Sequence, residues 1–295
     1  MDAWILITFA AATFQTLRFV LQKRLSAKEL SAAGATFARF IYSFPFAFAI
    51  ALAYQQISAQ AWPQIAPVFW AYCVIGGISQ ILATVCVVML LGRRNFAVGV
   101  TFKKTEVILA VIVGLIVLGD GISVPSLAAV LIGMGGVLML SKPGKGGGWD
   151  SAAVALGLGS GVLFAISGVT YRGATLSVIS DDPLIRSSVA LALATLFQTL
   201  AMLVWLVWRD RPQITKVLNA WRRAGLIGVL SLFGSLSWFT AFTLQSAGLV
   251  KAVGQVELIL SILAGRLLFG ERLSSRELAG IATIGLSVVV LVLVS

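Results

Sequence analysis

Residues 106–127 read EVILAVIVGLIVLGDGISVPSL, and residues 257–278 read ELILSILAGRLLFGERLSSREL. The two stretches lie 151 positions apart and align without a gap. Each begins with a glutamate inside an apolar run, Glu106 or Glu257, and reaches a glycine followed by an acidic residue thirteen positions later. Buried carboxylates are costly in a membrane, and a duplicated one is typical of a transport path formed by two related halves.

The composition around these stretches is that of a membrane protein. In 295 residues, apolar side chains make up 59% and charged side chains 11%, and the mean hydropathy is +1.00. A soluble protein could not cover its surface with so few charges. The apolar runs reach about 20 residues, the length that crosses a hydrocarbon core of about 30 Å. The sequence therefore predicts an all-α polytopic membrane protein.

Breaks rich in charge, glycine or proline divide the chain into ten expected transmembrane helices. These are 3–22, 30–54, 66–91, 96–118, 122–141, 151–172, 184–208, 223–244, 248–268 and 275–294. The glycine-rich run 142–150 is the natural linker between a first five-helix repeat at 1–141 and a second at 151–295. Because five is an odd number, the second repeat inserts with the opposite orientation, and the two halves form an inverted repeat.

The basic residues predict the orientation of the chain. They gather in the odd-numbered loops, whereas the even-numbered loops hold almost none except Arg172 at a helix end. The net charge of +11 is therefore a sign of membrane orientation and not of nucleic-acid binding. By the positive-inside rule we expect a multi-pass protein of the inner (plasma) membrane with both termini extracytoplasmic.

Ionisable side chains inside the expected helices each need an explanation, because charge is costly there. Lys103 and Glu106 lie three residues apart on one helical face, where they form either a structural ion pair or part of a cavity wall. Glu257 has no cation one turn away, so its partner comes from another helix or is a proton. Lys104 lies about 100° around an ideal helix from Lys103 and is not expected to face the same cavity equally.

Further candidates for a central cavity come from polar stripes at helical spacing. Gln15 and Arg18 share a stripe in the first span, where Arg18 either snorkels to the interface or faces the interior. Tyr171 and Trp238 offer flat aromatic surface to a substrate or anchor the chain at the interface. The expected substrate-binding residues are Arg39, Lys103, Lys251, Glu106, Glu257, Arg18, Gln15, Trp238 and Tyr171.

Catalytic and metal-binding chemistry is not expected. The chain has no histidine, no Walker loop and no nucleophile elbow. Cys73 and Cys86 are thirteen residues apart in one expected helix, about 20 Å and too far for a disulfide. We expect no enzyme activity, no cofactor and no metal. The expected partners are a small-molecule substrate and membrane lipid, and the Gly157–Gly161 pair leaves monomer or homodimer open.

Taken together, these features resemble the drug/metabolite transporter superfamily, EamA type. The resemblance rests on ten short spans, the five-plus-five duplication and the Gly-Asp/Glu-x-x-Ser elements at 119–123 and 270–274, and it covers the whole chain. It implies alternating access around a central cavity, with the fifth and tenth helices peripheral, tight structural turns at both Gly-acidic pairs, and export as the direction. The chain departs from many relatives in lacking proline after the glutamates, since Val107 and Leu258 stand there, so a proline-broken helix is not expected.

The expected function is secondary active transport of a small anionic or zwitterionic organic metabolite. Arg39, Lys103 and Lys251 would bind the anion, and Glu106 and Glu257 would respond to protons or pair with cations. Two alternatives stay open. A flippase for an amphipathic or lipid-linked anion would need a lateral gap near Arg18 and Arg39, and a non-transporting membrane scaffold or receptor would have a dry interior with every charge paired.

Overall fold

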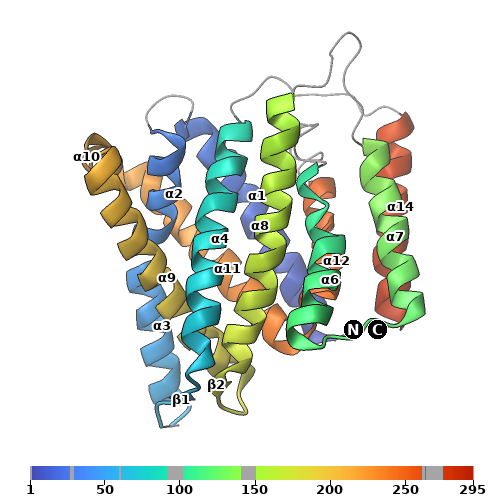
Figure 1. Ribbon diagram of the computed structural model, residues 1–295, viewed down its shortest axis with the longest axis horizontal. Coiled ribbons are helices and arrows are strands. Elements are labelled where there is room, and N and C mark those ends of the chain that lie inside the picture. Colours follow the sequence, from blue (N-terminus) through green and yellow to red (C-terminus); the bar gives the residue numbers. More distant parts are fainter. Residues whose placement is uncertain are drawn as a thin grey trace.

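The computed structural model describes residues 2–26, 30–59, 61–91, 102–140, 151–260, 263 and 275–294. Within these ranges the chain forms a helical bundle (Figure 1). The helices of the first half are α1 (Ala3–Ser26), α2 (Ala32–Ile41), α3 (Phe44–Ile57), α4 (Val68–Leu91), α6 (Glu106–Leu118) and α7 (Val124–Leu140). Those of the second half are α8 (Ser151–Leu176), α9 (Pro183–Arg209), α10 (Pro212–Asn219), α11 (Trp221–Leu244), α12 (Ala247–Val253) and α14 (Ser275–Val294).

The bundle has the helices that a polytopic membrane protein needs. Six described segments are long and apolar enough to cross a membrane, and shorter apolar helices cover Glu106–Leu118, Val124–Met139 and Leu278–Val294. The shorter ones belong to the fourth, fifth and tenth expected spans. The prediction of an all-α polytopic membrane protein is thus confirmed, although the linker 142–150 lies outside the described residues.

The second expected span consists of two helices. α2 ends at Ile41 and α3 begins at Phe44, with Pro45 in its first turn. Proline has no N–H, and inside a helix its ring would clash with the carbonyl four residues earlier, which belongs to Ile41. The break places Arg39 in the last turn of α2, and this position decides which side chains it reaches.

Two small elements were not expected from the sequence. β1 (Gln64–Ile65) pairs antiparallel with β2 (Val178–Ile179) and joins the two halves of the chain. The amphipathic helix α10 lies in the expected loop between α9 and α11, and Pro212 lies in its first turn. In Figure 1 the strands lie at the same end of the bundle as both termini, and α10 lies at the opposite end.

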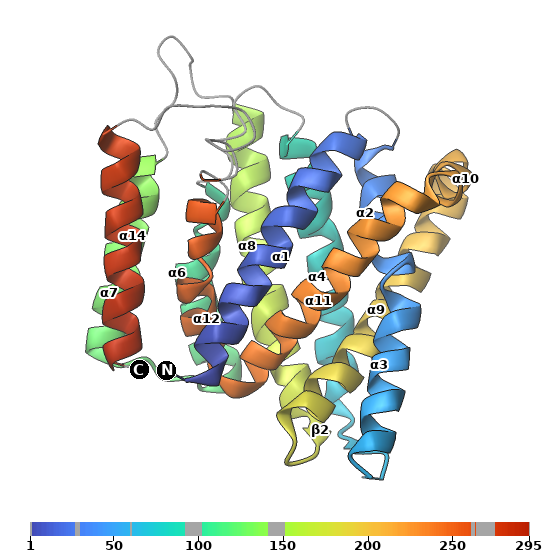
Figure 2. The same cartoon turned by 180° about the vertical axis from the view of Figure 1, so that it is seen from behind.

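α7 and α14, the fifth and tenth spans, lie side by side at one edge of the bundle in both views (Figures 1 and 2). They approach closely at Gly136, where a Cβ would lie 3.0 Å from the carbonyl oxygen of Gly280. The Ser287 hydroxyl also donates to the Ala129 carbonyl at 2.7 Å. This peripheral pair leaves the remaining helices to surround the interior.

Candidate functional site

Each duplicated glutamate follows an interruption of its helix. Residues 104–105 form a turn before α6 begins at Glu106, and residues 254–255 form a turn before Glu257. The Glu257 N–H donates to the Gly254 carbonyl, three residues earlier, at 3.1 Å. The absence of proline had argued against a proline-broken helix, yet both helices are interrupted without one. Discontinuous helices of this kind form binding sites in transporters.

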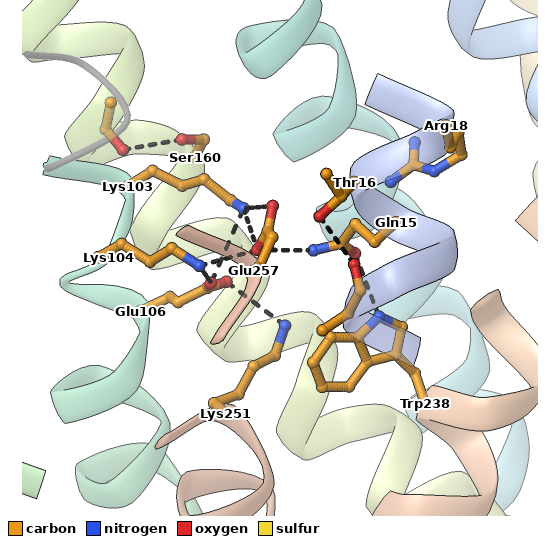
Figure 3. Close-up of polar contacts among 12 residues, drawn as sticks. Gln15, Thr16, Arg18, Lys103, Lys104, Glu106, Ser160, Trp238, Lys251 and Glu257 are labelled. Carbon is orange, nitrogen blue, oxygen red and sulfur yellow. Dashed lines mark hydrogen bonds and ion pairs between the residues drawn. The ribbon is translucent and has the colours of Figure 1, made fainter. Parts of the chain in front are cut away.

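The turn at 104–105 brings two neighbouring lysines into one cluster (Figure 3). Lys104 Nζ lies 2.8 Å from Glu257 Oε2, and Lys103 Nζ lies 3.5 Å from both carboxylate oxygens. The expectation that Lys104 faces elsewhere is therefore wrong. It assumed 100° between successive residues, which holds only in a regular helix.

Glu106 completes the cluster from the other side. Its Oε2 lies 3.4 Å from Lys251 Nζ, while its Oε1 lies 3.9 Å from Lys103 and 4.0 Å from Lys104. The local pair between Lys103 and Glu106 exists, but it is longer than the pair with Lys251. We call Lys103, Lys104, Glu106, Lys251 and Glu257 the ion cluster, and all five side chains are buried.

Gln15 and Trp238 extend this cluster towards α1 and α11. The Gln15 amide donates to Glu257 Oε2 at 3.0 Å, and its oxygen accepts from Trp238 Nε1 at 3.1 Å. The Lys251 ammonium lies 4.8 Å from the centre of the Trp238 ring, within the range of a cation–π interaction. Trp238 is 8% exposed, so it lies in the interior and is not an anchor at the membrane interface.

A cavity of about 10 Å³ lies next to the cluster, which is room for about one water molecule. Its walls come from five helices and include Gln15, Gln80, Phe164, Tyr171, Trp238 and Lys251. Four of the nine expected site residues thus line one cavity. The small volume means that the bundle is closed around it.

The sequence reasoning missed two glutamines: Gln80 in this wall, and Gln198, which bonds to it. Gln198 Nε2 donates to the Tyr171 hydroxyl and to Gln80 Oε1, each at 2.9 Å, and the Tyr171 hydroxyl donates to the same Gln80 oxygen at 3.3 Å. The Tyr171 ring packs at 4.4 Å from Phe239. An amide in the middle of an apolar span was the available signal, because such groups need interhelical partners.

Arg18 and Arg39 are buried apart from the ion cluster, at 2% and 3% exposure. Arg39 donates to three hydroxyls: Ser231 at 2.9 Å, Thr84 at 2.9 Å and Ser235 at 3.4 Å. Arg18 donates to Gln22 Oε1 at 2.8 Å and lies 4.4 Å from the ring centre of Phe19. Arg18 therefore faces the interior here and does not snorkel.

The end of the bundle that carries the strands is held shut by a second ion pair. Arg172 of α8 meets Asp120 through two bonds, Nε to Oδ2 at 2.8 Å and Nη2 to Oδ1 at 3.0 Å. Its other Nη donates to the carbonyls of Phe242 and Gln245 at 2.7 and 2.9 Å. Asp120 is positioned by Gly119, whose φ of 68° needs a residue without a Cβ. The matching pair Gly270-Glu271 lies outside the described residues.

The electrostatic balance of the interior is positive. Among the described residues, five buried cationic side chains, Arg18, Arg39, Lys103, Lys104 and Lys251, meet two buried carboxylates, Glu106 and Glu257. Among the residues that the structure describes, no group of three or more potential metal ligands occurs. The chemistry that this interior offers is the binding of an anionic group by lysines, arginines and hydroxyls.

Comparisons with known proteins agree with the fold. Residues 2–142 and 151–293 each match the EamA-like transporter family, whose members are membrane transporters. A solved structure described as "Crystal structure of protein" superposes with a TM-score of 0.69 at 16% identity, over 99% of this chain and 97% of that chain. At this identity the likeness shows the fold alone. No curated protein matches. The two family matches cover nearly the whole chain, which belongs to the EamA-like transporter family.

Proposed function

We propose that this chain is a secondary transporter of a small anionic or zwitterionic organic molecule, acting by alternating access in the inner membrane. The observation that carries the proposal is the surplus of buried cations over buried carboxylates in the described part of the chain, five against two. A buried charge without a partner costs several kcal/mol, and in a membrane such residues mark a substrate or ion path. An anionic ligand would offset the surplus.

The proposed binding residues are the nine that the sequence singled out, and they divide into three groups. Gln15, Tyr171, Trp238 and Lys251 line the cavity. Lys103, Glu106 and Glu257 adjoin it through the ion cluster. Arg18 and Arg39 supply the remaining positive charge from α1 and α2.

We also propose proton coupling through the two glutamates. Each carboxylate is held in its charged form by lysines that an anionic substrate would compete for. A carboxylate that loses its lysine in a buried site takes up a proton, because an isolated charge there is far more costly than a neutral acid. Anion binding and proton uptake would then occur together.

Neither alternative function gains support from the geometry. A flippase would need a lateral opening near Arg18 and Arg39, but both side chains are buried among the described helices. A non-transporting scaffold would have every charge paired, whereas neither arginine has a carboxylate within 4.0 Å in the described ranges.

The test is transport by the purified protein in liposomes. A panel of labelled carboxylates, phosphate esters, amino acids, neutral sugars and amines is offered with and without a pH gradient. We expect flux of an organic anion or zwitterion, increased by the gradient and reduced in Glu106→Gln and Glu257→Gln. Asp181→Asn, an exposed acid far from the interior, is the matched control. Flux of sugars or amines alone would overturn the substrate class, and full gradient-driven flux in both glutamine variants would overturn the proton coupling.

A further inference from the structure

The two buried arginines differ from the lysines in having no carboxylate in contact among the described residues. Within the described part of the chain, no carboxylate oxygen lies within 4.0 Å of Arg18 or Arg39. Arg18 is repelled by Arg39 and attracted by Glu257, which is not in contact with it. Arginine remains charged in proteins, so neither group can remove this repulsion by losing a proton.

Their hydrogen bonds are incomplete as well. A guanidinium carries five N–H donors. Among the described residues, Arg39 makes three hydrogen bonds, all to neutral hydroxyls, and Arg18 makes one, to the Gln22 amide oxygen. The hydroxyls of Ser231 and Ser235 can themselves donate to a ligand. The pair therefore offers several donors and two positive charges to an acceptor that the chain does not supply.

The ion cluster is different because its lysines already have partners. Glu257 lies 2.8 Å from Lys104, and Glu106 lies 3.4 Å from Lys251. An anion that enters the cluster must compete with these carboxylates. An anion that enters between Arg18 and Arg39 meets no described carboxylate within 4.0 Å of either guanidinium group.

We propose that Arg18 and Arg39 bind the anionic group of the transported molecule, a carboxylate or a phosphate, while its apolar body lies on the side of the neighbouring cavity, which has room for about one water molecule here and must widen to admit it. This inference rests on the proposed function and assigns the place of the charge within it. A carboxylate and a phosphate can each accept two parallel hydrogen bonds from the paired N–H donors of a guanidinium.

Ser235 connects the arginine pair to the cavity. Its hydroxyl accepts from Arg39 at 3.4 Å, and the residue lines the cavity together with Tyr171, Trp238 and Phe239. An anion bound at Arg39 thus has aromatic rings on its cavity side. This arrangement favours an organic anion over inorganic phosphate, because rings bury an apolar body.

Binding to the purified full-length protein in detergent tests the assignment. The probes are benzoate, inorganic phosphate and dihexanoyl phosphatidylglycerol, which separate a free organic anion, a free phosphate and a lipid headgroup. We expect benzoate to bind most tightly, and Arg18→Gln or Arg39→Gln to raise its Kd by about ten-fold or more. Arg39→Lys keeps the charge and serves as a second variant in case Arg39→Gln does not fold. It should also weaken benzoate binding, because an ammonium lacks the paired donors of a guanidinium. Arg222→Gln, an exposed arginine, is the control and should bind as wild type.

The outcomes separate this inference from the proposed function. In one outcome, Arg18→Gln and Arg39→Gln both bind benzoate as tightly as the wild type while Lys251→Gln loses binding. That result would place the anion site in the ion cluster. It would overturn this inference and leave the proposed function standing. Binding of the lipid and not of benzoate would assign the arginines to a headgroup and overturn the free-anion assignment. No binding of any probe by the wild type would count against the inference and the proposed function together.

Thermal unfolding gives a second readout that a purely structural arginine would not produce. Removing a buried charge that lacks a counter-charge stabilises a protein, so Arg39→Met should raise the unfolding midpoint of the ligand-free protein. Benzoate should raise the midpoint of the wild type and leave that of Arg39→Met unchanged. A midpoint below the wild type would mean that the three hydroxyls hold a structural arginine, and would overturn its assignment to the anion.

Discussion

Glu106 and Glu257 are equivalent residues of the two repeats, and each makes its shortest ion pair with a lysine of the opposite repeat. Glu106 lies 3.4 Å from Lys251, and Glu257 lies 2.8 Å from Lys104. The lysines themselves are not equivalent, because the 151-residue shift places Lys104 opposite Gln255. The repeat therefore duplicates the carboxylates and not the cations. Substitutions of the two glutamates are therefore expected to differ in their effects on the stability of the protein and on proton coupling.

Glu257→Gln should destabilise the protein more than Glu106→Gln. Glu257 accepts from Gln15, Lys103 and Lys104, whereas Glu106 accepts, among the described side chains, from Lys251 alone, at 3.4 Å. Breaking a buried pair leaves uncompensated charge and costs about 3–5 kcal/mol, and Glu257 should be near the upper end. Unfolding in detergent measures both variants, with Asp181→Asn as control. Equal losses, or a larger loss at Glu106, would contradict the expected order.

A double variant should recover part of this loss. Lys104→Met alone leaves Glu257 with one lysine fewer, and Glu257→Gln alone leaves Lys104 without its closest acceptor. When both charges are removed, neither group is left unpaired, and the coupling energy should be about 1–3 kcal/mol in a double-mutant cycle. The control pair is Lys216→Met with Glu257→Gln, because Lys216 is exposed on α10. Additive losses for Lys104 and Glu257 would mean that their 2.8 Å contact contributes nothing.

Arg172 should control access from the end of the bundle that carries the strands. It bonds both oxygens of Asp120, which belongs to the first half, and the carbonyls of Phe242 and Gln245 at the end of α11, so Arg172→Gln removes two bonds between the two halves and two within the second half. In a background with Cys73 and Cys86 replaced, a cysteine at Ser167 in the cavity wall should react faster with a small maleimide when Arg172 is changed. Arg172→Lys, which keeps the charge and loses the paired contact, should lie between the two rates.

An unchanged rate in Arg172→Gln would mean that this ion pair does not limit access. The Tyr54 hydroxyl donates a hydrogen bond to Asp182 at 2.8 Å at the same end of the bundle, and its removal offers a comparison with the loss of the ion pair. Tyr54→Phe removes only one hydrogen bond and should increase the rate less, because a single bond contributes about 1 kcal/mol.

Much of the fold could be predicted from the sequence because a membrane limits the choices. Apolar length identified the spans, and the odd number of helices per half required the inverted arrangement. The break at Pro45 had a visible signal in the proline itself. The pairing of β1 with β2 had none, because two-residue strands carry no periodicity that a sequence could reveal.

The site was harder to predict because it depends on departures from helical geometry. Glu106, Glu257 and Lys251 were recognisable as charges inside apolar runs. Lys104 was recognisable in the same way, but its direction was not, because the turn that redirects it carries neither proline nor glycine. That no described carboxylate contacts Arg39 is equally invisible in a sequence, since it depends on which side chains of α4 and α11 lie opposite.

The end with the strands and both termini should face the outside of the cell. α10 lies at the opposite end (Figure 1) and carries Lys216 within a segment that also holds Arg209, Arg211, Arg222 and Arg223. Basic segments stay in the cytoplasm, so a cysteine at the exposed Asn219 should react with an impermeant maleimide only in permeabilised cells. A cysteine at the exposed Asp181, beside β2, should react in intact cells. The reverse labelling pattern would mean that the chain has the opposite orientation in the membrane. Arg172 would then lie at the cytoplasmic end. Reaction of both sites in intact cells would contradict the two-sided arrangement itself.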